Sequence, residues 1–273
     1  MPEFEEAQVR VSIFLGLFLI LAILQYFSPR RVPRADTKMR WFTNWAIAII
    51  DSVVLRFLFA SAAVGAALWA QQNNYGLFNL SNTSGWVTGI ISFIVLDFAI
   101  WLSHVASHKI PIFWKVHRMH HSDVDFDVTT AIRFHPIEIV LSMLWKFAIV
   151  IAIGAPPISV LLFEIILNGT AMFNHSNLKL NLAFDRWLRI FVVTPDMHRV
   201  HHSIIHNETD SNYGFNLAIW DRIFGTYIDQ PEAGHDDMII GLDDWQDERP
   251  TKLIWSLCVP FISKSTQNKP SGK

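Results

Sequence analysis

Long apolar stretches alternate with polar segments along this chain, and each stretch is long enough to cross a lipid bilayer as a helix. Residues 11–29 contain no charged side chain, and a helix of that length approaches the roughly 30 Å of a hydrocarbon core. Two further stretches cover 45–70 and 85–103, and a fourth apolar region runs from 136 to 173. The pattern predicts an all-α, multi-pass membrane bundle with four or five apolar spans.

A short break divides the fourth apolar region into 136–154 and 157–173. The break reads Gly154-Ala155-Pro156-Pro157, and glycine and proline end helices. We therefore expect a helical hairpin that either spans the bilayer fully or re-enters it from one side.

Two charged residues, Asp51 and Arg56, interrupt the stretch 45–70. Charges are costly in lipid, so we expect them to face the bundle or to pair with each other. A functional charge pathway is the alternative.

The composition supports a membrane protein and excludes several other classes. Of the 273 residues, 51% are hydrophobic and only 17% are charged, whereas soluble domains carry about 25% charged residues. The formal net charge of −2 offers no general attraction for nucleic acid. The single cysteine, Cys258, excludes an internal disulfide and any CxxC metal motif.

The basic residues predict how the chain is oriented, because short cytoplasmic loops are enriched in lysine and arginine. The loops 71–84 and 154–157 have no charge, whereas the loops 28–41 and 104–135 are basic. We expect residues 1–273 to form one integral membrane domain with its N-terminus outside. Residues 104–135 and 174–250 would then form a cytoplasmic, histidine-rich helical cap. The basic residues are Arg30, Arg31, Arg34, Lys38, Arg40, Lys109, Lys115, Arg118 and Arg133.

All 12 histidines fall between His104 and His235, and eight of them form three tight clusters. On a helix, residues three or four apart share a face, so each cluster can chelate a metal. In an HxxHH cluster the adjacent histidine lies about 100° further round the helix, where it can reach a second ion. Eight nitrogen donors exceed the need of one tetrahedral zinc, so we expect a dinuclear centre. The clusters are His104-Val-Ala-Ser-His108, His117-Arg-Met-His120-His121 and His198-Arg-Val-His201-His202.

The donor type leaves the metal open among zinc, copper, iron and nickel. No cluster has the glutamate of an HExxH motif, which disfavours zinc-dependent hydrolysis. Bis-histidine haem would need single histidines within facing spans, and here the histidines lie at span ends and in loops. Two further hypotheses are a metal transporter and a zinc site that only ties the cap to the bundle.

Three histidine boxes in a multi-span chain resemble the fatty acid hydroxylase and sterol desaturase superfamily of membrane non-haem di-iron oxygenases. The resemblance is strongest to bacterial sterol-desaturase-like proteins and alkylglycerol monooxygenases. One departure is Val105, where many relatives have arginine. The match covers about residues 90–230 and includes Asp97, Phe113-Trp114, His120-His121-Ser122, Arg133-Phe-His-Pro-Ile-Glu138, Asn174-His175, His201-His202-Ser203, Asn212-Tyr213-Gly214, Trp220-Asp221 and Phe224-Gly225-Thr226.

The resemblance implies two iron ions held by the eight clustered histidines, with His175 as a ninth ligand. It also implies an O2-dependent oxidoreductase that hydroxylates or desaturates a fatty acyl, sterol or alkylglycerol lipid. The chain has no GxGxxG fingerprint and no cysteine set for an iron–sulfur cluster. Electrons would therefore come from a separate electron-transfer protein or a reduced pterin. The alternative is a histidine-rich membrane metal-binding or transport protein without oxygenase activity.

Several polar residues are candidates for orienting the ligands, because metal-bound histidines usually donate their other N–H to a carboxylate or carbonyl. Asp97 lies two helical turns before His104 on the same face, which makes it the first candidate. The further candidates are Asn174, Asp123, Asp125, Asp127 and Asp196, although Asp125 and Asp127 are more easily explained as a solvated acidic loop.

The remaining histidines are not expected to bind metal. We interpret His135, which precedes Pro136, as a helix-start residue in preference to a tenth ligand. His206 and His235 are treated as ordinary tail residues. Phe113, Trp114 and Phe134 are candidates for lining the path of a lipid substrate.

Overall fold

The computed structural model describes residues 3–59, 63–81, 83 and 85–262, and every regular element within them is helical apart from three isolated β-bridges. Five segments are long and apolar enough to cross a membrane. The prediction of an all-α bundle with four or five spans is therefore confirmed, and the chain is an integral membrane protein. The five segments are Ala7–Phe27, Thr37–Leu80, Trp86–Lys109, Pro136–Ile153 and Pro157–Asn174.

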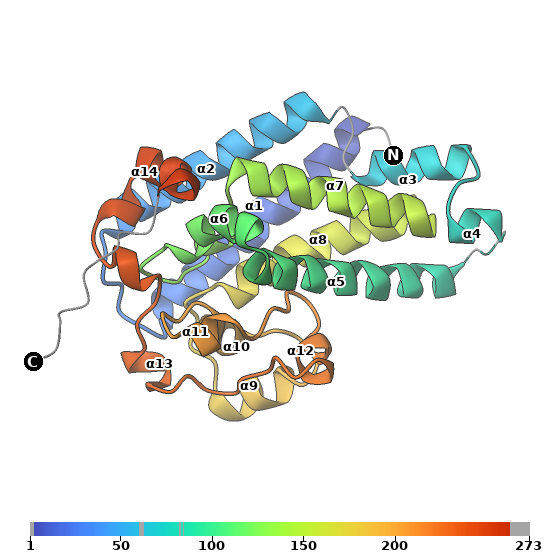
Figure 1. Cartoon of the computed structure of the whole chain (residues 1–273). Coiled ribbons are helices and arrows are strands. Elements are labelled where there is room, and N and C mark those ends of the chain that lie inside the picture. The colour runs from blue at the N-terminus through green and yellow to red at the C-terminus, as the bar shows by residue number, and fades with distance from the viewer. Residues whose placement is uncertain (1–2, 60–62, 82, 84, 263–273) are drawn as a thin grey trace, which may run out of the picture.

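The long helices lie roughly along one direction, and most of the short ones, α9 to α13, form a separate layer beside one end of them (Figure 1). The long helices are α1 (Glu3–Phe27), α2 (Thr37–Leu58), α5 (Trp86–Lys109), α7 (Pro136–Ile153) and α8 (Pro157–Asn174), with the shorter α3 (Ala63–Gln72) and α4 (Leu77–Leu80) at the far end. The others are α6 (Pro111–His121), α9 (Leu182–Leu188), α10 (Pro195–His201), α11 (His206–Thr209), α12 (Ile219–Ile223), α13 (Gly234–Asp237) and α14 (Leu253–Cys258), with 3-10 turns at Thr130–Ile132, Asp243–Trp245, Arg249–Thr251 and Val259–Phe261.

The stretch 45–70, predicted as one helix, is divided in the structure. Helix α2 begins earlier, at Thr37, and ends at Leu58, and α3 begins at Ala63. Residues 60–62 lie outside the described part of the chain. Both helices pack on α7, but α3 also packs on α8 whereas α2 also packs on α14. Hydropathy reports only that a segment avoids water, so it could not reveal this division.

The hairpin predicted at Gly154-Ala155-Pro156-Pro157 is present as α7 and α8. Gly154 ends α7 with a left-handed φ of 66°, which glycine adopts without strain, and Pro157 begins α8. Behind the hairpin lies the main apolar core, where α3, α5, α7 and α8 meet. This core contains Ala67, Leu96, Val150, Val160 and Phe163.

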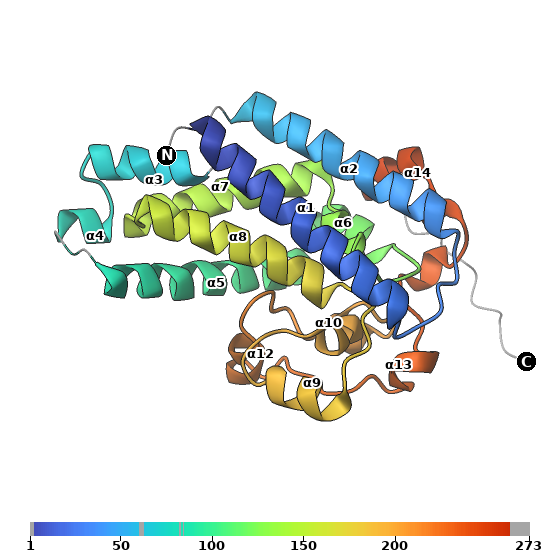
Figure 2. The ribbon, with the colours of Figure 1, turned by 180° about the vertical axis from the view of Figure 1, so that it is seen from behind.

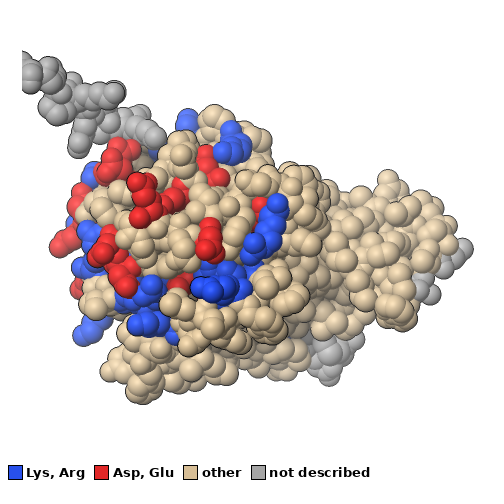
Figure 3. All heavy atoms as spheres, turned by 90° about the horizontal axis from the view of Figure 1, so that it is seen from below, with Lys and Arg blue, Asp and Glu red and all other residues tan. Residues whose placement is uncertain are grey.

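The outer surface of the bundle is apolar. Helix α1 covers α8 diagonally (Figure 2), yet Val11 is 56% exposed and Leu19 is 59% exposed. Seen from below, charged side chains gather at the end opposite α3 and α4 (Figure 3). Such a distribution fits one end in water and an apolar girdle in lipid.

The segment after α8 forms a compact layer of short helices, α9 to α13, against one end of the bundle (Figures 1 and 2). Helix α10 contacts α8 and also α11 and α13, so this layer lies directly on the spanning helices. The last helix, α14, packs against α2 on the other side. Residues far apart in the sequence therefore meet where the spans end.

Candidate metal centre

Nine histidines converge at the end of the bundle in two groups. Within each group, one ring nitrogen from every member lies within 4.8 Å of the others. The first group is His104, His108, His117, His121 and His201, and the second is His120, His175, His198 and His202. These are the eight clustered histidines together with His175.

Four separate elements bring these rings together. Helix α5 ends with His104 and His108, and α6 carries His117, His120 and His121. His175 follows α8 directly, and α10 carries His198 and His201 with His202 as its C-cap. Proline at the first position starts both α6 and α10, as its fixed φ favours.

The two HxxHH motifs each contribute to both groups. In α6, His117 and His121 belong to the first group and His120 to the second. At α10 the division is reversed, because His198 and His202 belong to the second group and His201 to the first. The groups adjoin each other, since the rings of His121 and His202 stack with centroids 4.6 Å apart.

In the first group, His104 and His201 direct the lone pairs of their Nε2 atoms toward each other. His104 Nδ1 lies 2.7 Å from the carbonyl oxygen of Tyr213, and His201 Nδ1 lies 2.7 Å from that of Ser211. A carbonyl only accepts, so both Nδ1 atoms carry the proton. In neutral rings the two Nε2 atoms are then bare, and they lie 3.0 Å apart. A cation between them removes the repulsion.

The second group repeats this arrangement. His175 Nδ1 donates to the carbonyl of Ala171 at 2.7 Å, and His120 Nδ1 donates to that of Arg133 at 3.2 Å. Their Nε2 atoms lie 3.2 Å apart. Burial lowers the pKa of His175 to about 4 and that of His120 well below its usual value, so both rings are neutral near pH 7.

Other ring nitrogens of the two groups are buried without a hydrogen-bond partner. They include His108 Nε2, His121 Nδ1, His198 Nδ1 and both nitrogens of His202. Leaving buried polar atoms unpaired is costly. Each ring offers one nitrogen to a metal, so coordination would satisfy His108 Nε2 and one nitrogen of His202, whereas His121 and His198 already turn Nε2 toward another ring of their group. The residues therefore fit two adjoining metal ions with nitrogen ligands, as in a dinuclear centre.

Asp97 does not contact His104, contrary to the sequence-based expectation. Its carboxylate accepts hydrogen bonds from Trp220 Nε1 at 2.7 Å and from the Leu217 backbone N–H at 3.3 Å. The ring of His104 is held instead by the Tyr213 carbonyl. Helical spacing places Asp97 on the same face as His104, but the segment before α12 packs over that carboxylate.

The other polar candidates also bind elsewhere. Asn174 donates to the carbonyl of Phe215, and Asp196 pairs with Arg199. Asp125 accepts from the backbone N–H groups of Arg34 and Ala35. The interpretation of Asp125 and Asp127 as a solvated loop was wrong, because both side chains are buried.

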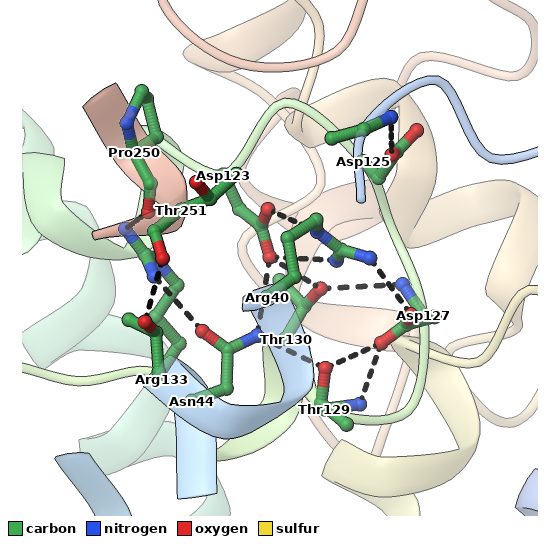
Figure 4. A network of polar contacts seen from close by, with 12 residues as sticks. Arg40, Asn44, Asp123, Asp125, Asp127, Thr129, Thr130, Arg133, Pro250 and Thr251 are labelled. Atoms are coloured by element: carbon green, nitrogen blue, oxygen red, sulfur yellow. Dashed lines mark hydrogen bonds and ion pairs between the residues drawn. The ribbon is translucent and has the colours of Figure 1, made fainter. Parts of the chain in front are cut away.

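Asp123 and Asp127, in the loop that follows the second histidine cluster, bind one arginine. Arg40 of α2 donates to Asp123 at 2.7 Å and to Asp127 at 2.9 Å, and all three side chains are buried (Figure 4). The pair with Arg40 keeps the pKa of Asp123 below its usual value although burial acts to raise it. These contacts hold the loop that ends at Arg133, whose carbonyl orients His120.

Two carboxylates that sequence reasoning missed do contact the histidines. Glu138 in the first turn of α7 lies 2.5 Å from His117 Nδ1, and Asp210 lies 3.3 Å from His108 Nδ1. Glu138 could have been found, because an acidic residue in an apolar span is a functional candidate. Asp210 has no comparable signal in the sequence.

We expect Glu138→Gln to weaken metal binding by about 10- to 100-fold, because the carboxylate fixes the orientation and raises the basicity of the His117 ring. The measurement is metal content after dialysis against a graded series of chelator concentrations. Glu248→Gln, on the surface and away from the two groups, serves as the control. Equal metal retention by both variants and the unmodified protein would contradict this role.

The three remaining histidines lie outside both groups. His135 is the N-cap of α7 and accepts from the Ile137 backbone N–H, as expected of a helix-start residue. His206 is largely exposed. His235 is buried, and its Nε2 lies 3.8 Å from Asp196 Oδ2. His235 is thus part of the packed layer, not a solvated tail residue.

A cavity of about 890 Å³ opens beside the first histidine group and extends between α2, α5 and α7. His104 and His117 form part of its wall, together with Phe113 and Phe134. The third aromatic candidate, Trp114, packs on the ring of His108 instead. The cavity is mostly apolar, and its volume is in the range of small-molecule and cofactor pockets.

The two charged residues of the stretch 45–70 behave differently. Asp51 is buried and lines the cavity, in agreement with the expectation that it faces the bundle. Arg56 is exposed on α2, and no ion pair joins it to Asp51 among the residues that the structure describes. The expectation for Arg56 was therefore wrong.

Comparison with known proteins identifies relatives that oxidise lipids. Residues 89–226 match the family described as fatty acid hydroxylase. The chain is 30% identical to human alkylglycerol monooxygenase over 84% of its length and 48% of the relative's. It is 38% identical to the Xenopus tropicalis alkylglycerol monooxygenase over 59% of its length and 34% of the relative's.

A bacterial relative is an ornithine lipid hydroxylase from Rhizobium tropici, 27% identical over 55% of this chain and 44% of the relative. The chain spans between about a third and a half of the length of these three relatives. No solved structure matches the chain significantly.

Proposed function

Because the chain belongs to the fatty acid hydroxylase family, we propose that it is a di-iron, O2-dependent enzyme that oxidises a C–H bond of a membrane lipid. The observation that carries the proposal is the pair of adjoining histidine groups beside an apolar cavity. When bound, two iron ions would supply the redox chemistry that activates O2. His104 and His117 belong to the first histidine group and also line the cavity, so a lipid in the cavity would lie next to the centre that activates O2.

The nine histidines would hold the iron ions, five in the first group and four in the second. The carbonyls of Tyr213, Ser211, Arg133 and Ala171 keep the proton on Nδ1 and so direct Nε2 toward the metal. Glu138 does the same for His117 through its carboxylate. The chain thus presets the ligand orientation before metal binds.

The cavity would hold the lipid chain. Its apolar wall excludes water and places the chain against His104 and His117, on the side of the first histidine group. Hydroxylation, desaturation and ether-bond oxidation all require this placement, and they differ in which C–H bond is held there. Residues of the spanning helices α2, α5 and α7 line the cavity, so a lipid would enter it from the bilayer.

The histidine end of the bundle would face the cytoplasm, where a separate electron-transfer protein or a reduced pterin supplies electrons. The basic loops support this orientation. The single cysteine, Cys258, is exposed in α14 at the histidine end. A membrane-impermeant maleimide should label it in inside-out vesicles and not in intact cells, and the reverse labelling would overturn the orientation.

Metal analysis and lipid mass spectrometry test the main proposal. We expect about two irons per chain, as the two groups imply, and O2 consumption that depends on added lipid. Lipids from cells with the unmodified chain should contain a product shifted by one oxygen or two hydrogens, and this product should be absent with His201→Ala. Zinc-loaded protein should stay folded and inactive. Lipid-independent O2 uptake, or a metal other than iron in active protein, would refute the proposal.

A metal transporter is the competing function, and the placement of the ligands argues against it. A transport pathway would distribute ligands through the spans, whereas both histidine groups lie at one end of the bundle. Metal uptake into vesicles that contain the purified chain would support the transporter instead.

A further inference from the structure

Asp51 is a buried acidic side chain on α2 that faces the cavity without a partner. The residue is 7% exposed, and it lines the cavity together with His104 and His117. Its Oδ1 is buried with no hydrogen-bond partner. No hydrogen bond or ion pair of this carboxyl occurs within the described ranges of the chain.

Most other polar side chains of the cavity wall have partners within the described part of the protein, and the two that have none there, Ser142 and Asn168, are less buried than Asp51. Ser52 donates to the Ala48 carbonyl at 2.8 Å, and Ser103 donates to the Ile100 carbonyl at 2.8 Å. Lys146 is paired with Glu164 at 2.7 Å. These groups are satisfied by the protein, which leaves them little capacity to recognise a ligand.

The remaining acidic group, Glu138, is committed to the histidines. One of its oxygens accepts from His117, although the other, Oε2, has no partner. Asp51 therefore differs from every other charged side chain on the cavity wall, because nothing in the protein uses it. An unpaired carboxyl in an apolar cavity is costly, and such exceptions occur at functional sites.

We propose that Asp51 binds a hydroxyl group of the lipid substrate and thereby determines which lipids the cavity accepts. This inference rests on the proposed function, since it assigns the recognition of the substrate in the same cavity. The hydroxyl would donate a hydrogen bond to the carboxyl, and the chain would follow the apolar wall toward His104 and His117. The spacing between Asp51 and the first histidine group would then select the carbon that is oxidised.

The test compares two probes with the same alkyl chain and the same oxygen, of which only one has a hydrogen-bond donor. The probes are octadecanol and its methyl ether, and the measurement is the Kd for the metal-free full-length chain in nanodiscs. A hydrogen bond between neutral groups corresponds to roughly a 2- to 10-fold preference. We therefore expect the unmodified chain to bind the alcohol about 5-fold more tightly than the ether.

Asp51→Leu is expected to bind both probes equally, because leucine has a similar size and no acceptor. Its Tm should be equal to or higher than that of the unmodified chain, since a buried unpaired carboxyl is removed. Asp51→Asn should retain a reduced preference for the alcohol. Arg56→Gln, on the same helix and outside the cavity, should keep the full preference.

A lack of preference in the unmodified chain would overturn the inference. An undiminished preference in Asp51→Leu would also overturn it, and Asp51→Ala, which likewise lacks an acceptor, provides the same decision if the leucine variant does not fold. These Kd values need neither iron nor turnover. Failure of the oxygenase proposal would thus appear as absent oxidation with the binding preference intact, and failure of the inference as oxidation without the preference.

Discussion

His175→Ala is expected to reduce lipid oxidation by more than about 100-fold and to remove metal from the second group. Mutation of a residue that only hydrogen-bonds a metal ligand typically lowers metal affinity or activity by about 10- to 100-fold, and loss of the ligand itself should lower them further. His175 Nε2 lies 3.2 Å from His120 Nε2 and 3.1 Å from His198 Nε2, at the centre of that group. The measurements are metal content per chain and the rate of product formation. Only the second group should lose its ion.

His206→Ala is the matched control, because it removes the same side chain from an exposed position outside both groups. It should leave metal content and rate unchanged. If His175→Ala retained both ions and normal turnover, His175 would not be a ligand, and its place in the second group would be structural.

Arg40→Leu is expected to lower the free energy of unfolding by about 3–5 kcal/mol, because it leaves Asp123 and Asp127 buried without their cation. The loop between α6 and α7 depends on these contacts, and Arg133 at its end carries the carbonyl that orients His120. We therefore expect weaker metal binding together with the lower stability. Unfolding of the metal-free chain in detergent measures the loss of stability directly, without a contribution from metal binding.

Arg34→Leu provides the comparison on the same side of the molecule. Its guanidinium makes an exposed, 3.4 Å contact with Gln246, so its loss should cost no more than about 1 kcal/mol. A similar cost for Arg40→Leu and Arg34→Leu would mean that the buried ion pairs contribute little to holding the loop.

The amino-acid sequence alone was sufficient to predict the number of apolar spans and the positions of the histidine boxes, although not the division of the stretch 45–70. Hydropathy located the hairpin at Gly154 and Pro157, because apolar length and helix breakers are local properties. The i, i+4 spacing indicated that His117 and His121 share one helix face, and helix geometry makes that relation independent of the rest of the fold.

The tertiary structure decided which residues meet between helices. Helical spacing suggested Asp97 as the partner of His104, but packing directs its carboxylate to Trp220 and leaves the His104 ring to a backbone carbonyl. Glu138 reaches His117 only because α7 crosses beside α6. Periodicity predicts the face of one helix, whereas contacts between helices depend on how their surfaces pack, and that information is spread over the whole chain.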